Sequence, residues 1–160
     1  MPIVVRVAVP ADAEFIANSN LAMALESENT RLDAARLRQG VAAVFSEPAR
    51  GFYLVAEWDG ARCGCLLVTT EWSDWRNAVF WWIQSVYVVP ERRRRGVYAH
   101  MHAETLKRAR AAGSVCGLRL YVDAQNRAAQ ATYKSLGMES SHYVLMEQTI
   151  ESNANGPGAL

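Results

Sequence analysis

The sequence predicts a mixed α/β protein in which helices cover both faces of one β-sheet. Three observations predict this class. Segments rich in β-branched residues alternate along the chain with segments of helical periodicity. Three strands are expected in succession between residues 52 and 89. The later strands are separated by helices, which favours right-handed crossovers between parallel neighbours.

The first third of the chain is predicted to hold one strand and two helices. Residues 3–8 are rich in β-branched side chains and predict a short strand. Pro10 and Asp12 suit the first turn of a helix that runs to about Leu25. Asp33 can cap a second helix, which ends near residue 47.

The middle of the chain predicts three strands in a meander. Residues 52–58 and 62–71 are joined by Asp59-Gly60, a strong hairpin signal. Residues 78–89 are almost continuously apolar, so this strand is expected to be central and covered on both faces.

The last part of the chain returns to alternating helices and strands. The helix after Gly96 is expected to reach Ala112, with Gly113 at its C-terminus. Asn126 suits the N-cap of a further helix that Gly137 terminates. Two strands complete the pattern, at residues 118–122 and 138–149.

Length and composition fit a single domain. The 160 residues are 51% hydrophobic and 21% charged, so residues 1–150 are read as one domain and residues 151–160 as a flexible tail. No apolar run approaches the ~20 residues of a membrane span, and no signal peptide is evident. We therefore expect no membrane association and a cytoplasmic location.

Charge and cysteine content exclude several classes. The net charge of +1 argues against a general nucleic-acid binder. Three cysteines are too few for a disulfide framework and favour a reducing compartment. Cys63 and Cys65 are expected on one face of a strand, and His100 and His102 at the surface or in a groove, so no metal site is predicted.

The most informative segment is Val86-Tyr-Val-Val-Pro-Glu-Arg-Arg-Arg-Arg-Gly96, where a strand passes into a helix through a basic loop. The first turn of a helix has backbone N–H groups without intrahelical partners, and its dipole adds positive charge. This combination predicts a phosphate site. A solvated surface or a nucleic-acid patch is the alternative for an arginine run.

Two motifs resemble the GNAT family of acetyl-CoA-dependent N-acetyltransferases. The segment from Pro90 to Ala99 is similar to the family's Pro-x-x-[Arg/Gln]-x-x-Gly-x-[Gly/Ala] pyrophosphate loop. The segment from Asn126 to Met138 is similar to its Asn-x-x-Ala-x-x-x-Tyr-x-x-x-Gly-[Phe/Met] motif. The resemblance implies a mixed, mostly antiparallel sheet of six to seven strands with a splayed central strand pair.

The resemblance also implies the cofactor, acetyl-CoA, and how it is held. The pantetheine arm would bond to the backbone of the splayed strand, where a bulge could leave the Val86 N–H free to polarise the thioester carbonyl. Backbone amides of the loop would hold the pyrophosphate. The expected cofactor-binding residues are Val86, Tyr87, Val88, Arg93, Arg94, Arg95, Gly96, Val97, Tyr98, Ala99 and Asn126.

Tyr98 departs from the family pattern, which has Gly or Ala at this position. Its backbone N–H remains available, because a helix N-terminus needs no positive φ. Either its side chain turns away from the pyrophosphate or the nucleotide sits slightly differently.

The second motif supplies the candidate catalytic group. The resemblance implies that Tyr133 is the general acid that protonates the departing thiolate, because a phenol with an ordinary pKa near 10 is protonated at neutral pH. A packed helix aromatic is the alternative. Asn126 can be an N-cap, a cofactor contact, or both.

The resemblance also implies that the acceptor pocket is built from the loop between the first two helices and from the meander. Carboxylates beside aromatic rings suit a cationic amine, and a surface loop with buried tryptophans is the alternative. The candidates are Glu26, Glu28, Trp72, Trp75, Trp82 and Gln84.

The sequence therefore favours an enzyme that acetylates a small-molecule or protein amine. A non-catalytic CoA-binding or regulatory protein of the same fold is the alternative, and a nucleic-acid module is disfavoured. Exposed edge strands leave a homodimer open.

Overall fold

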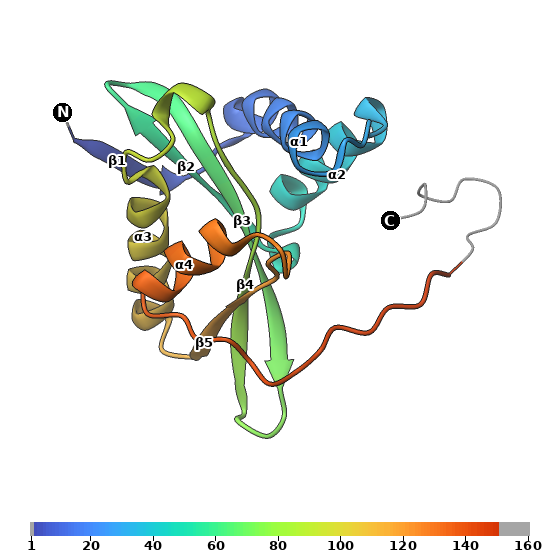
Figure 1. Cartoon of the computed structure of the whole chain (residues 1–160), viewed down its shortest axis with the longest axis vertical. Helices are drawn as coiled ribbons and strands as arrows, with labels where there is room; N and C mark the ends of the chain where they lie inside the picture. Colours follow the sequence, from blue (N-terminus) through green and yellow to red (C-terminus); the bar gives the residue numbers. More distant parts are fainter. Residues whose placement is uncertain (1, 151–160) are drawn as a thin grey trace. The chain divides into compact units, whose positions relative to one another are not determined.

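The computed structural model describes residues 2–150 (Figure 1). The chain consists of two compact units, Met1–Gln125 and Asn126–Leu160. The first unit holds the sheet, and the second holds helix α4 (Arg127–Ser135). The prediction of one domain over residues 1–150 stays a prediction, and the predicted tail lies outside the described residues.

The sheet in the first unit has five strands in the order β1-β2-β3-β4-β5. Their bounds are Ile3–Val7, Phe52–Trp58, Ala61–Ser73, Ala78–Val88 and Val115–Leu120. The first four strands pair antiparallel, and β4 pairs with β5 in parallel. The predicted hairpin turn is confirmed, because Asp59 and Gly60 have φ angles of 54° and 76°.

Three long helices belong to the first unit: α1 (Ala13–Glu28), α2 (Ala34–Ser46) and α3 (Val97–Ala112). The predicted caps are confirmed. The Asp33 carboxylate accepts a hydrogen bond of 3.0 Å from the Arg36 N–H at the start of α2. Gly113 ends α3 with a left-handed φ of 72°, a conformation that glycine adopts without steric cost.

Helices cover both faces of the sheet, as predicted. On one face, α3 packs Val97 and Met101 against Leu54 and Leu66. On the other, α1 packs Ile16 against an apolar cluster of the sheet. Figure 1 shows α3 on one side of the strands and α1 with α2 on the other. Strand β4 contributes to both clusters, which confirms that it is central.

An ion cluster around the buried Asp12 links the turn before α1 to strands β1 and β3. The Asp12 side chain is fully buried, and its carboxylate lies 2.7 Å from Arg6 Nη1 and 2.6 Å from Arg62 Nε. It also accepts a hydrogen bond of 2.8 Å from the Val9 N–H. Arg6 in turn pairs with Glu57 at 2.6 Å. The hydrogen bond from Arg6 is the main reason that the pKa of Asp12 lies well below its usual range.

The predicted last strand, residues 138–149, is wrong. Residues 139–150 form neither helix nor strand and are exposed, so the described sheet has five strands instead of six or seven. Alternating apolar residues are typical of a strand, but a strand also requires a partner whose backbone it can pair with.

The prediction that Cys63 and Cys65 lie on one face of a strand is also wrong. Cys63 belongs to the cluster on the α3 face, and Cys65 to the cluster on the α1 face. The register of β2 and β3 shifts between Ala56 and Glu57, where β3 carries an extra residue. This bulge cancels the usual alternation and places the two thiols on opposite faces.

Candidate active site

The central feature of the site is the separation of the two parallel strands. β4 and β5 pair from Val79 with Val115 to Ile83 with Leu120, and no further. β4 continues to Val88, so its last five residues have no partner on the β5 side within the described sheet. β5 itself ends at Leu120, so this stretch of β4 runs past its neighbour, and a backbone edge without a partner can bind an extended ligand. The predicted splaying of the two strands stays a prediction.

A β-bulge lies within this free segment. Gln84 pairs with Leu67, and Tyr87 pairs with Cys65. Between these two pairs β4 therefore has one residue more than β3. Ser85 takes a left-handed φ of 50° at this point. The extra residue brings the Gln84 and Tyr87 side chains to the same face, which regular alternation would separate. The predicted bulge at Val86 is therefore found.

The strand leads into a basic loop that precedes α3. A short 3-10 turn, Pro90–Arg92, follows β4, and Arg94 and Gly96 then take left-handed φ angles of 57° and 81°. Gly96 is the N-cap of α3, so the first N–H groups of that helix are directed toward the loop. The helix dipole and exposed Arg94 and Arg95 add positive charge there.

The Tyr98 side chain turns along α3. Its ring packs against the apolar cluster on the α3 face, and its hydroxyl lies 3.5 Å from Nδ1 of His102. His102 is buried, whereas the sequence predicts a position at the surface or in a groove, and burial lowers the pKa of its imidazole. This direction of the side chain favours the first of the two arrangements considered for Tyr98, in which it turns away from the pyrophosphate.

Glu26, near the end of α1, contacts both strand β4 and the loop before α3. Its carboxylate lies 2.6 Å from Arg93 Nη2 and accepts a hydrogen bond of 3.3 Å from the Tyr87 hydroxyl. Arg93 also donates from Nε to the Val88 carbonyl at 2.9 Å. Burial, with the negative charge of Glu26, raises the pKa of Tyr87.

A second polar cluster lies further along the same face of β4. Trp82 donates from Nε1 to Glu71 at 3.3 Å, and its ring lies 4.5 Å from that of Tyr121. Glu71 also pairs with Arg119 at 2.7 Å. Gln84 donates to the Thr69 hydroxyl at 2.5 Å.

The structure does not bring all the predicted acceptor residues together. Trp72 pairs with Val79, whose side chain packs on the α3 face, so Trp72 projects to the face opposite Trp82. Trp75 is 86% exposed in the turn between β3 and β4. Trp72 is also distant from Glu26, because its partner Val79 lies about 25 Å along β4 from Tyr87, which contacts Glu26. Glu28 and Glu26 are both exposed near the end of α1, but Glu26 is the one that contacts Arg93 and Tyr87. Glu26, Trp82 and Gln84 remain on one face.

The second unit contains the other predicted site residues. Asn126 caps α4, accepting a hydrogen bond of 3.0 Å from the Ala129 N–H, which confirms its predicted capping role. Tyr133 lies on the half-buried face of α4 with Ala129, and burial raises the pKa of its phenol. Tyr133 therefore keeps its proton at neutral pH.

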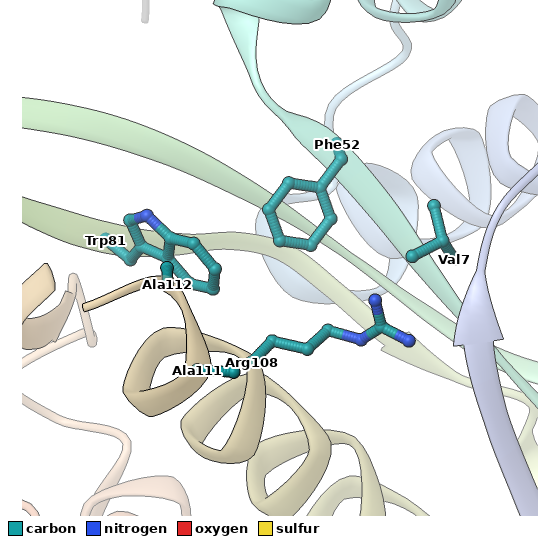
Figure 2. A pocket seen from close by; sticks show the side chains of 6 residues that line it. All are labelled: Val7, Phe52, Trp81, Arg108, Ala111 and Ala112. Carbon is teal, nitrogen blue, oxygen red and sulfur yellow. The ribbon is translucent and has the colours of Figure 1, made fainter. Parts of the chain in front are cut away.

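A hollow of about 380 Å³ lies on the other face of the sheet, between the strands and the C-terminal end of α3 (Figure 2). Its lining contains none of the predicted site residues: it consists of Val7, Phe52, Trp81, Arg108, Ala111 and Ala112. Arg108 extends beneath Phe52 in Figure 2 and pairs with Glu104 at 2.7 Å. This hollow is therefore separate from the unpaired end of β4 and from the face of Trp82 and Gln84.

The sequence did not indicate three residues that lie near Trp82 on this face: Glu71, Arg119 and Tyr121. Tyr87, which the sequence predicts at the cofactor, donates from its hydroxyl to Glu26. Alternation along β3 could have found Glu71, because it pairs with Phe80 on the face of Trp82. No local signal links residues as distant in the chain as Glu71 and Arg119.

The fold and the site define an α/β protein in which a strand that extends beyond its parallel neighbour continues through a basic loop into a helix. The acetyltransferase (GNAT) family model matches residues 16–138, and the chain belongs to this family. No protein in a search of curated proteins matches the chain.

Solved structures are similar over nearly the whole chain. A possible acetyltransferase from Clostridium difficile 630 is 36% identical, with a TM-score of 0.88, over 95% of this chain and 100% of that one. The acetyltransferase AAC(6')-Iy, in complex with a CoA-containing bisubstrate analogue, is 16% identical with a TM-score of 0.73, over 94% of this chain and 99% of that one. A soil-metagenome aminoglycoside acetyltransferase bound to sisomicin is 15% identical with a TM-score of 0.73, over 93% and 97%. The last two show the fold alone.

Two kinds of feature are absent from residues 2–150, a membrane-spanning helix and a metal-binding cluster. None of the helices in this range is both long and apolar enough to cross a membrane. The same residues contain no group of three or more His, Cys, Asp or Glu side chains placed to hold a metal ion.

Proposed function

We propose that this protein transfers an acetyl group from acetyl-CoA to an amine acceptor. The observation that carries the proposal is the course of β4. Its pairing with β5 stops at Ile83, it has a bulge at Ser85, and it continues into the loop that ends at Gly96, the N-cap of α3. Family membership supports acetyl transfer as the type of reaction.

The residues present fit acetyl-CoA. Backbone groups of Val86, Tyr87 and Val88 would hold the pantetheine arm, as an added strand would be held. The N–H groups from Arg94 to Ala99 would bind the pyrophosphate, with Arg93 and Arg95 adding charge. A Cβ built on Gly96 would meet only the His100 ring, at 3.8 Å, so this position is open toward a ligand. Asn126 is a further candidate contact.

Bound acetyl-CoA supplies the acyl carbon as an activated thioester. The Val86 N–H is the candidate donor to the developing oxyanion, because the bulge beside it interrupts regular pairing. The Tyr133 hydroxyl is the candidate general acid, and its raised pKa keeps a proton on Oη for the departing thiolate.

The acceptor is proposed to be an amine that binds as a cation and loses one proton, to Glu26 or to water, before its neutral nitrogen attacks the thioester. Glu26 offers a carboxylate, and the Trp82 ring offers a cation–π surface. Gln84 lies on the same face and offers an amide for hydrogen bonding. Glu28, Trp72 and Trp75, although predicted from the sequence, are not included, since they lie apart from this group. The acceptor would be a small molecule or a protein amine, and neither nucleic acid nor a membrane is proposed as a partner.

Two measurements test the proposal. Acetyl-CoA should raise the melting temperature in a concentration-dependent way, because it binds only the folded state. Incubation with acetyl-CoA and a panel of amines should release free CoA thiol and add one acetyl group to an amine, detected by mass spectrometry. A melting shift without thiol release on any amine would favour the alternative, a non-catalytic CoA-binding protein. Absence of both would refute the proposal.

A further inference from the structure

The hollow at the C-terminal end of α3 has no role in the proposed function. All six residues that line it belong to the first unit. Its volume of about 380 Å³ falls within the usual range of small-molecule sites. Because a water molecule takes up roughly 30 Å³ of the liquid, the hollow has room for roughly a dozen non-hydrogen atoms. It therefore suits a small organic molecule, whereas CoA is far too large for it.

Two aromatic rings form part of the lining. Phe52 and Trp81 meet edge to face, with ring centroids 5.2 Å apart and ring planes at 74°. Trp81 is only 9% exposed, so the packing around it holds its ring in place. Ala111 and Ala112, at the end of α3, line the hollow with methyl groups only. A flat apolar group fits this lining, because a further ring can extend an edge-to-face aromatic cluster.

One cation enters the apolar lining. Figure 2 shows the Arg108 guanidinium extending beneath Phe52 toward Val7. Its Nε donates to Glu104 Oε1 at 2.7 Å, one helical turn away, which fixes the direction of the guanidinium. Among the residues that the structure describes, neither Nη atom of Arg108 has a hydrogen-bond or ion-pair partner. These two nitrogens are therefore available to both oxygens of one carboxylate.

The charge around Arg108 also favours an anion. Glu104 pairs with Lys107 at 3.5 Å as well as with Arg108, so one carboxylate is shared by two cations. An added carboxylate would balance the remaining positive charge. Arg108 is half-buried, and its attraction for an anion is stronger there than at a fully exposed position.

We propose that this hollow is a second ligand site, which binds a small aromatic carboxylate. The ring of the ligand packs against Phe52 and Trp81, and its carboxylate accepts hydrogen bonds from Nη1 and Nη2 of Arg108. The 16 residues of α3 separate this site from the loop at Gly96 by about 24 Å. Binding at the hollow is therefore expected to leave the proposed acetyl-CoA site free.

The test uses two probes that differ in charge. Fluorine NMR follows the titration of 4-fluorophenylacetate with the full chain. Saturable binding is expected, with a dissociation constant on the order of 1 mM for a ligand of this size. The neutral 4-fluorophenylacetamide should bind about tenfold more weakly, because it lacks the charge-assisted hydrogen bonds to Arg108. A saturating concentration of acetyl-CoA should displace neither probe.

One pair of variants tests the carboxylate contact. Arg108→Gln should weaken binding of the carboxylate about tenfold and leave binding of the amide unchanged. Arg110→Gln is the matched control, because Arg110 is exposed on the same helix but does not line the hollow. It should bind both probes as the wild type does.

A second pair tests the location of the ring. Ala112→Phe should abolish binding of both probes, since the added ring takes up part of the hollow. Ala103→Phe, at an exposed position of α3 outside the lining, should bind both probes normally. Melting temperatures of all four variants check that each one is folded.

Every outcome of these titrations decides. Carboxylate binding that Arg108→Gln and Ala112→Phe impair, and that both controls retain, supports the site. No saturable binding of 4-fluorophenylacetate up to about 10 mM overturns it. Equal binding of the two probes, unchanged carboxylate binding in Arg108→Gln or Ala112→Phe, or displacement by acetyl-CoA overturns it as well. The titrations involve neither turnover nor an amine acceptor, so their failure is distinguishable from failure of the proposed function.

Discussion

Glu26 and Arg93 form an ion pair of 2.6 Å across 67 residues of chain, joining the end of α1 to the loop before α3. Arg93 is one of the expected phosphate-binding residues, and Glu26 is one of the expected acceptor-binding residues. The two proposed subsites therefore share a contact. A pyrophosphate that attracts Arg93 would compete with Glu26, and a released Glu26 carboxylate would be available to a cationic amine.

Substituting Glu26→Gln should raise KM for a cationic amine about fivefold while lowering kcat little, which is the effect of losing uniform binding. It should not weaken acetyl-CoA binding, because Arg93 loses its competitor. Steady-state kinetics and calorimetric titration with acetyl-CoA would measure the two effects. Glu28→Gln, on an exposed acid of the same helix, is the control and should leave both unchanged. Equal behaviour of the two variants would remove Glu26 from the acceptor site.

The separation of the tryptophans between two faces makes a second prediction. Trp82→Ala should raise KM for the amine about tenfold, because it removes a cation–π surface and the partner of Glu71. Trp72→Ala should change KM less than twofold, since Trp72 projects to the opposite face. A larger effect from Trp72 than from Trp82 would place the acceptor on the α3 face.

Gly96 tests the phosphate site. Gly96→Glu should abolish the melting shift caused by acetyl-CoA, because a carboxylate would stand where the pyrophosphate is bound. Gly96→Gln, of the same size but neutral, should retain most of the shift. Both variants should lose about 1 kcal/mol of stability without ligand, since φ is 81° at this position. A full shift in Gly96→Glu would exclude the loop from the cofactor site.

Tyr133 tests the general acid. Tyr133→Phe should lower kcat about 10²-fold, within the usual range for a positioned acid, and change acetyl-CoA binding little. Because burial raises the pKa of Tyr133, wild-type kcat should show no loss from its ionisation up to at least pH 9. Tyr143→Phe, which removes a hydroxyl from an exposed ring of the same unit, is the control. Wild-type turnover in Tyr133→Phe would mean that another group protonates the thiolate.

The contacts of Asp12 predict that the free energy of unfolding decreases at acidic pH. The depressed pKa of Asp12 means that its contribution is complete above the unfolded-state pKa of about 3.9 and is lost as the pH falls through the lower folded-state value. Asp12→Asn should cost about 2–3 kcal/mol at pH 7, because Arg6 and Arg62 lose a buried charge partner. Urea unfolding at pH 7 and at pH 3 would show a smaller difference between variant and wild type at the lower pH. Asp59→Asn, in the exposed hairpin turn, should match wild type at both.

Local features of the fold were predictable from the sequence. Asp33 and Asn126 cap helices through contacts to residues three positions away, so the signal lies within one turn. The hairpin at Asp59-Gly60 and the basic loop before α3 are likewise complete within a few residues. The two GNAT motifs were recognisable for the same reason, since each consists of a single strand–loop–helix or loop–helix segment.

Contacts between distant residues needed the tertiary structure. The bulges at Cys63 and Ser85 change which face later side chains occupy, and a bulge depends on the register between two strands. The pairing of Glu26 with Arg93 and the position of Trp72 away from Trp82 follow from that register and from how α1 packs. Residues 138–149 show the same limit: their sequence determined a capacity to form a strand, but a strand exists only where a second backbone supplies the hydrogen bonds.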